Sequence, residues 1–231
     1  MDRPRRPVAL GFGMAALLAL LIALLLAGCG PKVQVGTKTR TAAPTTTPTM
    51  TPRPAGGKGM KTIYFAGGCF WGIEKYLDQI HGVSATEVGY ANGASNSATY
   101  GDGSGYAEAV RVDYDPSVAP LPFLLREFYL AIDPTSVDRQ GNDVGTEYRS
   151  GIYYVDPTDR PIIEASLATL QKRYSTPIAI ETGPLKTYTR AEDYHQKYLQ
   201  KNPEGYCHIP LSAFKQAASA RPEPSDFVTA K

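Results

Sequence analysis

KTIYFAGGCFWGIEKYLDQI, residues 61–80, is the stretch of this 231-residue chain that decides its fold. The apolar and aromatic residues of Lys61–Ala66 predict a β-strand. After it, apolar side chains recur every three or four residues, as on one face of a helix, at Phe70, Ile73, Leu77 and Ile80. Gly67 and Gly68 separate the two patterns, so the stretch predicts a strand, a glycine turn and a helix over 70–80, with Cys69 at the turn.

Further along, the chain continues to alternate between the two kinds of pattern. Strands are expected over residues 83–90, 107–114, 152–155 and 178–182, and helices over 122–132, 161–174 and 190–199. The order therefore begins βαββαβ, which predicts an α/β (α+β) two-layer sandwich with a ferredoxin-like core. We place this domain at residues 61–215, with a long loop-rich C-terminal part, and expect a flexible tail over 216–231.

The N-terminus has the composition of a targeting segment. Arg3, Arg5 and Arg6 precede an uncharged apolar run over 8–27, and small residues lie directly before Cys29. Such a combination is typical of a signal peptide. It resembles a bacterial lipoprotein signal, which implies that residues 1–28 are removed and that Cys29 is lipidated. A retained transmembrane anchor is the alternative, since about 20 apolar residues can span a bilayer. Both place the remainder outside the cytoplasm, at a membrane surface.

Residues 29–60 connect this segment to the predicted domain. Eight Thr, five Pro and five basic residues lie between residues 31 and 60, with no acidic residue, so a solvated tether is expected. Residues 1–60 hold 8 of the 24 Lys and Arg but only 1 of the 22 acidic residues, which leaves 16 basic and 21 acidic residues in the rest of the chain. A mildly acidic domain argues against nucleic-acid binding.

Cys69 is the first candidate for chemistry, because it lies between the glycine turn and the start of the predicted helix. Backbone N–H groups and the positive end of the helix dipole are expected to favour its thiolate. The two flanking glycines indicate close approach of backbone, while a buried and inert cysteine is the alternative. The neighbouring Phe70 and Trp71 suit a small apolar group, such as a methyl or a thioether, beside the reacting sulfur.

Glu108 is the second candidate, in the predicted strand 107–114. Residues two apart share a face of a strand, so Glu108 points to the same side as Val110, Val112 and Tyr114. Desolvation on this apolar side would raise the pKa of the carboxyl, as a general acid near neutral pH requires. The alternative is a glutamate at a frayed strand end that reaches solvent.

Three separated motifs resemble the A-type peptide methionine sulfoxide reductases. They are Gly-Cys-Phe-Trp-Gly at 68–72, Gly-Tyr-Ala-Glu-Ala-Val at 105–110 and Gln-Gly-Asn-Asp-Val-Gly-Thr-Glu-Tyr-Arg-Ser at 140–150. The resemblance runs from about residue 61 to residue 209. It implies an oxidoreductase that reduces methionine-S-sulfoxide, free or in proteins, to methionine. With the N-terminal segment, it predicts a lipoprotein form that repairs oxidised proteins outside the cytoplasm.

The resemblance also implies roles for individual residues. Cys69 matches the nucleophile that attacks the sulfoxide sulfur and is left as a sulfenic acid, and Glu108 matches the acid that protonates the sulfoxide oxygen. Tyr100 and Tyr148 match phenols that donate hydrogen bonds to that oxygen. The wall around the methyl group and a polar residue that orients the site are matched by Phe70, Trp71 and Asp143.

Cys207 matches a C-terminal resolving cysteine, which would condense with the Cys69 sulfenic acid to a redox-active disulfide. Thioredoxin or a related dithiol protein would then reduce this disulfide. With Cys29 lipidated, Cys69 and Cys207 are the two remaining thiols of the 3 in the chain, and a fixed stabilising disulfide is the alternative. We expect a monomer without a bound cofactor, and no metal site, because Cys207 and His208 lack a second pair of ligands.

The chain departs from the family pattern near Glu108. Tyr106 stands where a histidine is usual, and the loop from Tyr100 to Glu108 is shorter than in the family. Two rival classes also remain open. A cysteine hydrolase would use Cys69 with His195 and an aspartate, and a non-catalytic tethered surface module would have a structural cysteine pair. His195 lies in the predicted helix 190–199, where a lone histidine is usually structural.

Overall fold

The computed structural model describes residues 59–95 and 97–227. The chain divides into two units, residues 1–45 and 46–231, and all described residues belong to the second. The predicted signal peptide, the predicted lipidation site Cys29 and the predicted tether up to residue 58 lie outside the described residues. Within the described ranges, no helix is both long and apolar enough to cross a membrane.

A six-stranded sheet of order β7-β6-β1-β3-β2-β8 forms the centre of the domain. Its strands are β1 (Lys61–Gly67), β2 (Val83–Ala91), β3 (Ala107–Tyr114), β6 (Ser150–Tyr154), β7 (Glu181–Pro184) and β8 (Tyr188–Arg190). All neighbouring strands are antiparallel except β6 and β7, which run parallel. The inner order β6-β1-β3-β2 has β3 inserted between the two strands of a β-α-β unit, which confirms the predicted ferredoxin-like core.

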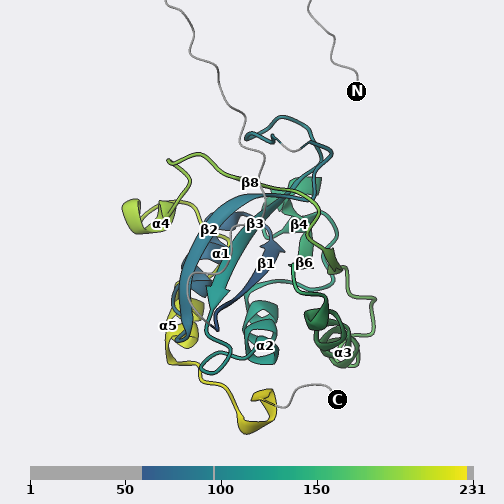
Figure 1. The fold of residues 1–231 in the computed structure, drawn as a ribbon. Coiled ribbons are helices and arrows are strands. Elements are labelled where there is room, and N and C mark those ends of the chain that lie inside the picture. The colour runs from purple at the N-terminus through teal and green to yellow at the C-terminus, as the bar shows by residue number, and fades with distance from the viewer. Residues whose placement is uncertain (1–58, 96, 228–231) are drawn as a thin grey trace, which may run out of the picture. The chain divides into compact units, whose positions relative to one another are not determined.

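Helices cover one face and one end of this sheet. The α-helices are α1 (Phe70–Leu77), α2 (Leu121–Ala131), α3 (Arg160–Gln171), α4 (Tyr198–Lys201) and α5 (Leu211–Ser219). Single 3-10 turns lie at η1 (Thr146–Tyr148), η2 (Pro157–Asp159) and η3 (Pro224–Phe227), and a small hairpin is formed by β4 (Arg139–Gln140) and β5 (Asp143–Val144). In Figure 1, α2, α3 and α5 lie at the lower end of the strands and β8 at the upper end.

The two faces of the sheet are as the strand periodicity predicts. Phe65 and Val110, which are paired across β1 and β3, belong to the main apolar core under the helices. Their neighbours Tyr64 and Ala109 point to the other face, where they pack in a second, smaller cluster with Tyr188. Strand β3 is buried over its whole length. A carboxyl on the core face of β3 is therefore held away from water.

The helix predicted over 190–199 is wrong. Residues up to Arg190 form edge strand β8, and the chain then turns, so that only the four residues of α4 are helical. One contact and one backbone conformation explain the difference. The Ala191 N–H donates to the Val88 carbonyl at 3.0 Å, which extends the sheet edge, and Lys197 has a left-handed φ of 53°. A left-handed residue ends a run of α-helical backbone.

Two other elements also differ from the prediction. The strand expected over 178–182 is displaced to β7, because the Ala179 N–H donates to the Pro134 carbonyl at 2.7 Å. Helix α5 crosses the predicted domain boundary at residue 215. Beyond it, the Asp226 carboxylate accepts two hydrogen bonds from Arg126 of α2, at 2.9 and 2.8 Å.

The strand register brings the end of β1 and the beginnings of β3 and β6 to the same end of the sheet. Gly67, the last residue of β1, pairs with Ser150, the first residue of β6. On the other side of β1, Ala66 pairs with Ala109, near the beginning of β3. The loops before β3 and β6 and the turn after β1 therefore meet at the upper end of the sheet in Figure 1, which is where the predicted catalytic residues lie.

Candidate active site

Cys69 is the N-cap residue of helix α1 and is 7% exposed. The two residues before it have to be small, as predicted, because atoms of neighbouring residues approach their backbone closely. Gly68 has a φ of +82°, and a Cβ atom there would lie 2.5 Å from the Cβ of Gln140. A Cβ atom on Gly67 would lie 2.7 Å from a methyl carbon of Ile132. A Cβ atom at either position would force its neighbours or the turn to shift, and at Gly68 the positive φ adds backbone strain.

The prediction that Cys69 is favoured as a thiolate is wrong for the substrate-free protein. Burial raises the pKa of the thiol far above its usual value, and Glu108 and Asp143 raise it further where they are ionised. The hydrogen bond from the Trp71 N–H to the sulfur acts in the opposite direction, but it is the weaker effect. At neutral pH the nucleophile therefore rests as a thiol, and its proton has to leave during the reaction.

Glu108 is buried on the core face of β3, with 2% of its surface exposed. Its Oε2 accepts the backbone N–H of Phe70, in the first turn of α1, at 3.0 Å. Burial raises the pKa of this carboxyl to about 8, and the nearby Asp143 and Glu147 carboxyls contribute to the rise. The predicted desolvation is confirmed, the solvent-reaching alternative is wrong, and Glu108 carries a proton at neutral pH.

The phenols of Tyr100 and Tyr148 lie next to each other, close to Glu108. They are hydrogen-bonded to each other, and burial raises the pKa of Tyr148, as does Glu108 once it is ionised. Tyr148 also interacts with Cys69, whereas Tyr100 is 53% exposed and forms the outer rim. Two hydroxyl donors, a protonated carboxyl and a thiol thus converge from four separate parts of the chain.

Tyr106 explains how the short loop before β3 still brings Tyr100 to the site. Its ring is buried at 5% exposure and packs on Tyr90, with the ring centroids 4.4 Å apart. Its hydroxyl accepts the backbone N–H of Gly101 at 2.8 Å. Because Gly101 follows Tyr100 directly, the phenol of Tyr106 fixes the tip of the loop.

An aromatic wall continues from the first turn of α1. Phe70 is fully buried, and the indole of Trp71 is partly exposed beside it, with the ring centroids 6.5 Å apart. The ring of Tyr198 stacks on the indole at 3.8 Å, and the Trp71 Nε1–H donates to Nδ1 of His195 at 3.0 Å. This wall offers an apolar surface close to Cys69.

His195 is not placed as the base of a cysteine hydrolase. Its Nδ1 is occupied by the indole N–H, so the ring proton is on Nε2. Burial lowers the pKa of His195, which keeps the imidazole neutral. The ring lies among the rings of Phe70, Tyr100 and Tyr194, with centroids 4.2–5.1 Å away, and is therefore part of the aromatic wall.

Asp143, in strand β5, contacts the backbone of Cys69. Its carboxylate accepts hydrogen bonds from the Cys69 N–H and from the phenol of Tyr206. Oδ2 also lies 3.7 Å from Nδ1 of His208. Burial raises the pKa of Asp143, while these partners lower it. Asp143 thus ties the hairpin β4–β5 and the C-terminal segment to the glycine turn.

Cys207 is a free thiol, like Cys69, and is partly buried. A Cβ atom on Gly72, three residues after Cys69, would lie 3.0 Å from the sulfur of Cys207. Cys207 therefore packs against the first turn of α1. The backbone N–H of Ile209 donates to the sulfur at 3.4 Å. The two thiols therefore lie near one another.

Two contact residues of the site escaped the sequence prediction. Tyr198 stacks on Trp71, and Tyr206 hydrogen-bonds Asp143. Both come from the C-terminal segment, where a tyrosine has no local pattern that distinguishes a site residue from a surface residue. Over the described ranges, no group of three or more His, Cys, Asp or Glu is arranged to hold a metal ion.

Comparison with known proteins identifies the family. The model of the family described as "Peptide methionine sulfoxide reductase" matches residues 61–225. The chain belongs to this family. It is 55% identical over 164 residues to the peptide methionine sulfoxide reductase MsrA of Lachnoclostridium phytofermentans, across 69% of this chain and 99% of the relative. It is 54% identical over 156 residues to MsrA of Clostridium perfringens, across 66% and 99%.

Solved structures of methionine sulfoxide reductases have the same fold. The reduced form of Mxr1 from Saccharomyces cerevisiae gives a TM-score of 0.62 at 35% identity, over 66% of this chain and 92% of that one. Methionine sulfoxide reductase A of Corynebacterium diphtheriae gives 0.59 at 38% identity, over 68% and 86%. The chain is thus an oxidoreductase with methionine sulfoxide reductase activity (EC 1.8.4.11), which decides against the hydrolase and the surface module.

Proposed function

We propose that Cys69 attacks the sulfur of methionine-S-sulfoxide while Glu108 donates its proton to the sulfoxide oxygen. The S–O bond breaks, the oxygen is transferred to the Cys69 sulfur as a sulfenic acid, and methionine is released. The thiol proton of Cys69 replaces the one that Glu108 has given, so the carboxyl ends the step protonated again. Tyr100 and Tyr148 donate hydrogen bonds to the oxygen as its negative charge develops, and Phe70 and Trp71 contact the methyl group.

One observation carries this proposal. The Glu108 carboxyl is 2% exposed, its pKa is raised to about 8, and one of its oxygens accepts the Phe70 N–H, in the residue next to the nucleophile. A sulfoxide oxygen is a poor leaving group until it is protonated. A neutral carboxylic acid beside a neutral thiol supplies that proton at pH 7 without a separate cationic acid.

The second half of the cycle involves Cys207. Its thiol attacks the Cys69 sulfenic acid, releases water and forms a disulfide. A dithiol protein such as thioredoxin then reduces the disulfide, and the two cysteines return to thiols. The contact of Cys207 with the first turn of α1 supports this role. No bound cofactor takes part, since the electrons come from the external dithiol.

The chain's location is part of the proposal. The charged and apolar N-terminal pattern ending at Cys29 supports a lipoprotein that is anchored at the outer face of the bacterial cell membrane. There a monomeric reductase on a Thr- and Pro-rich tether would repair oxidised methionines in extracytoplasmic proteins and peptides. Mass spectrometry of the membrane-bound protein is expected to find a diacylglyceryl group on Cys29, and an intact residue 1–28 segment would contradict it.

The activity is tested with the purified chain, dithiothreitol and a mixture of the two epimers of N-acetyl-methionine sulfoxide. We expect chromatography to show that only the S epimer is consumed, and that Cys69→Ser abolishes its loss. The matched variant Cys207→Ser should complete one turnover but fail to recycle with thioredoxin. Persistence of both epimers in folded protein would overturn the proposal, and full thioredoxin-dependent turnover by Cys207→Ser would remove Cys207 from the cycle.

A further inference from the structure

The indole of Trp71 is fixed by two residues of one segment, residues 191–200. His195 accepts the indole N–H at the ring edge at 3.0 Å. Tyr198 stacks on the ring face, with centroids 3.8 Å apart and planes inclined by 16°. Neither contact is made by helix α1 itself, so the plane of the indole depends on how the segment 191–200 is held.

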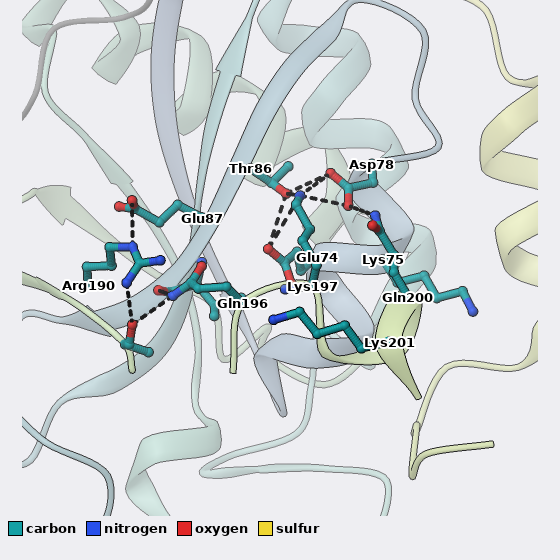
Figure 2. Close-up of polar contacts among 12 residues, drawn as sticks. Glu74, Lys75, Asp78, Thr86, Glu87, Arg190, Gln196, Lys197, Gln200 and Lys201 are labelled. Atoms are coloured by element: carbon teal, nitrogen blue, oxygen red, sulfur yellow. Dashed lines mark hydrogen bonds and ion pairs between the residues drawn. The ribbon is translucent and has the colours of Figure 1, made fainter. Parts of the chain in front are cut away.

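Lys197 lies between these two residues and connects the segment to α1 (Figure 2). Its backbone N–H donates to Oε2 of Glu74 at 2.8 Å. Its Nζ lies 2.8 Å from both carboxylate oxygens of Asp78, 3.4 Å from Oε1 of Glu74, and in hydrogen-bond contact with Oγ1 of Thr86. We call these four residues, Lys197, Glu74, Asp78 and Thr86, the Lys197 cluster.

The position of the cluster on α1 couples it to Trp71. Glu74 and Asp78 follow Trp71 by three and seven residues, so all three side chains lie on one face of the helix. Lys197 therefore binds the segment to the same face that carries the indole. Its left-handed φ of 53° turns the chain between His195 and Tyr198, which lets the first reach the indole edge and the second reach the indole face.

The two carboxylates of the cluster are largely removed from water, while the Lys197 side chain is 32% exposed. Glu74 is 1% exposed, and the side chain of Asp78 is 14% exposed. Burial raises the pKa of Glu74, whereas Lys197 acts to lower it. Burying a carboxylate without a cation costs free energy. The pairing of Glu74 with Lys197 therefore favours the one arrangement of the segment that keeps the two side chains in contact. Outside the cluster, Gln200 adds a hydrogen bond to Asp78 at 3.0 Å.

We propose that the Lys197 cluster positions Trp71 and thereby determines the size of the substituent that the enzyme accepts on the sulfoxide sulfur. The inference rests on the proposed contact of Trp71 with the substrate methyl group. Glu74, Asp78 and Lys197 are positioning residues, because they act through the indole and do not touch the substrate. A fixed indole leaves room for a methyl group, and a tilting indole admits a larger group.

The test compares the Lys197→Met variant with the wild type, both as the full-length enzyme, and uses two measurements. The chain has 1 Trp, so its indole N–H gives a single nitrogen–proton NMR peak that reports the hydrogen bond to His195 directly. The second measurement is the ratio of kcat/KM for methionine sulfoxide to kcat/KM for ethionine sulfoxide. We expect Lys197→Met to shift and broaden the indole peak and to lower this ratio by about fivefold or more, within the range that one methylene can contribute.

Three further variants separate the causes. Lys197→Gly keeps the left-handed backbone without strain but removes the side chain, and it should behave as Lys197→Met does. Lys197→Arg retains the positive charge and should restore most of the ratio. Lys201→Met is the matched control, because the Lys201 ammonium donates to the Asp193 carbonyl, at 3.1 Å, outside the Lys197 cluster, and it should leave both the peak and the ratio unchanged.

An indole peak and a substrate ratio that stay as in the wild type in both Lys197→Met and Lys197→Gly would overturn the proposal. If these variants do not fold, Thr86→Val removes one hydroxyl of the cluster and is judged by the same two measurements. The indole peak is independent of turnover. A chain that shows no sulfoxide reduction would therefore refute the proposed function, while the peak still decides whether the cluster holds Trp71.

Discussion

Glu108 and Glu74 are two nearly fully buried glutamates with opposite surroundings. Glu108 accepts one backbone N–H, and its pKa is raised by burial and, to a smaller extent, by the nearby carboxyls of Asp143 and Glu147. Glu74 accepts the Lys197 N–H and lies 3.4 Å from the Lys197 ammonium. The same side chain at the same degree of burial is thus a proton donor in one place and an anchor in the other. The difference comes from the presence of a cation.

The largest effect that distinguishes the two residues is expected from Glu108→Gln. An amide has nearly the shape of the neutral acid but cannot give a proton to the sulfoxide oxygen. The rate of the first turnover should therefore fall by about 100-fold or more, with little change in the melting temperature. Rapid-quench measurement of methionine formation tests this, and an unchanged rate would show that another group supplies the proton.

The opposite result is expected from Glu74→Gln, where stability changes more than the rate. The amide leaves the Lys197 ammonium with one negative partner fewer in a buried place, which should lower the free energy of unfolding by about 1–3 kcal/mol. Urea unfolding of the two glutamine variants side by side measures the difference. If Glu108→Gln were the less stable protein, the assignment of acid and anchor would have to be reversed.

A smaller effect is expected from Tyr106→Phe, which tests how precisely the site has to be held. The ring keeps its packing on Tyr90, but the hydrogen bond from Gly101 is lost. We expect kcat to fall by about fivefold at most, the equivalent of about 1 kcal/mol, because only the exposed Tyr100 is released. Tyr106→His, which introduces the residue expected from the family resemblance, is the comparison variant, and a loss of 100-fold would make Tyr106 part of the catalytic centre.

The core of the fold could be predicted because its patterns are local. The alternation in β3 placed Glu108 on the apolar face, and the glycines before Cys69 placed the cysteine at a helix start. The segment around His195 could not be predicted in this way. Its residues have helical spacing, but contacts to Val88 and Glu74, about a hundred residues earlier in the chain, hold it in a turn.

The same limit applies to the electrostatics of the site. The sequence predicts the raised pKa of Glu108, because burial on one strand face is sufficient to cause it. The sequence gives the wrong direction for Cys69, because the helix N-terminus is visible in the pattern while the surrounding desolvation and two carboxyls are not. Tyr198 and the Lys197 cluster depend entirely on packing between distant segments, so no sequence spacing indicates them.

The most direct test of the proton-donor role of Glu108 is the pH dependence of a single turnover. Cys207→Ser confines the reaction to the first step, and one methionine is formed per enzyme. Because Glu108 has its pKa raised to about 8, the protonated acid is lost as the pH rises through that value. The rate should be level below about pH 8 and fall above it, and the fall should be absent when Glu108→Gln is added. A rate that stays level or rises through pH 8, or the same fall in both proteins, would contradict the account.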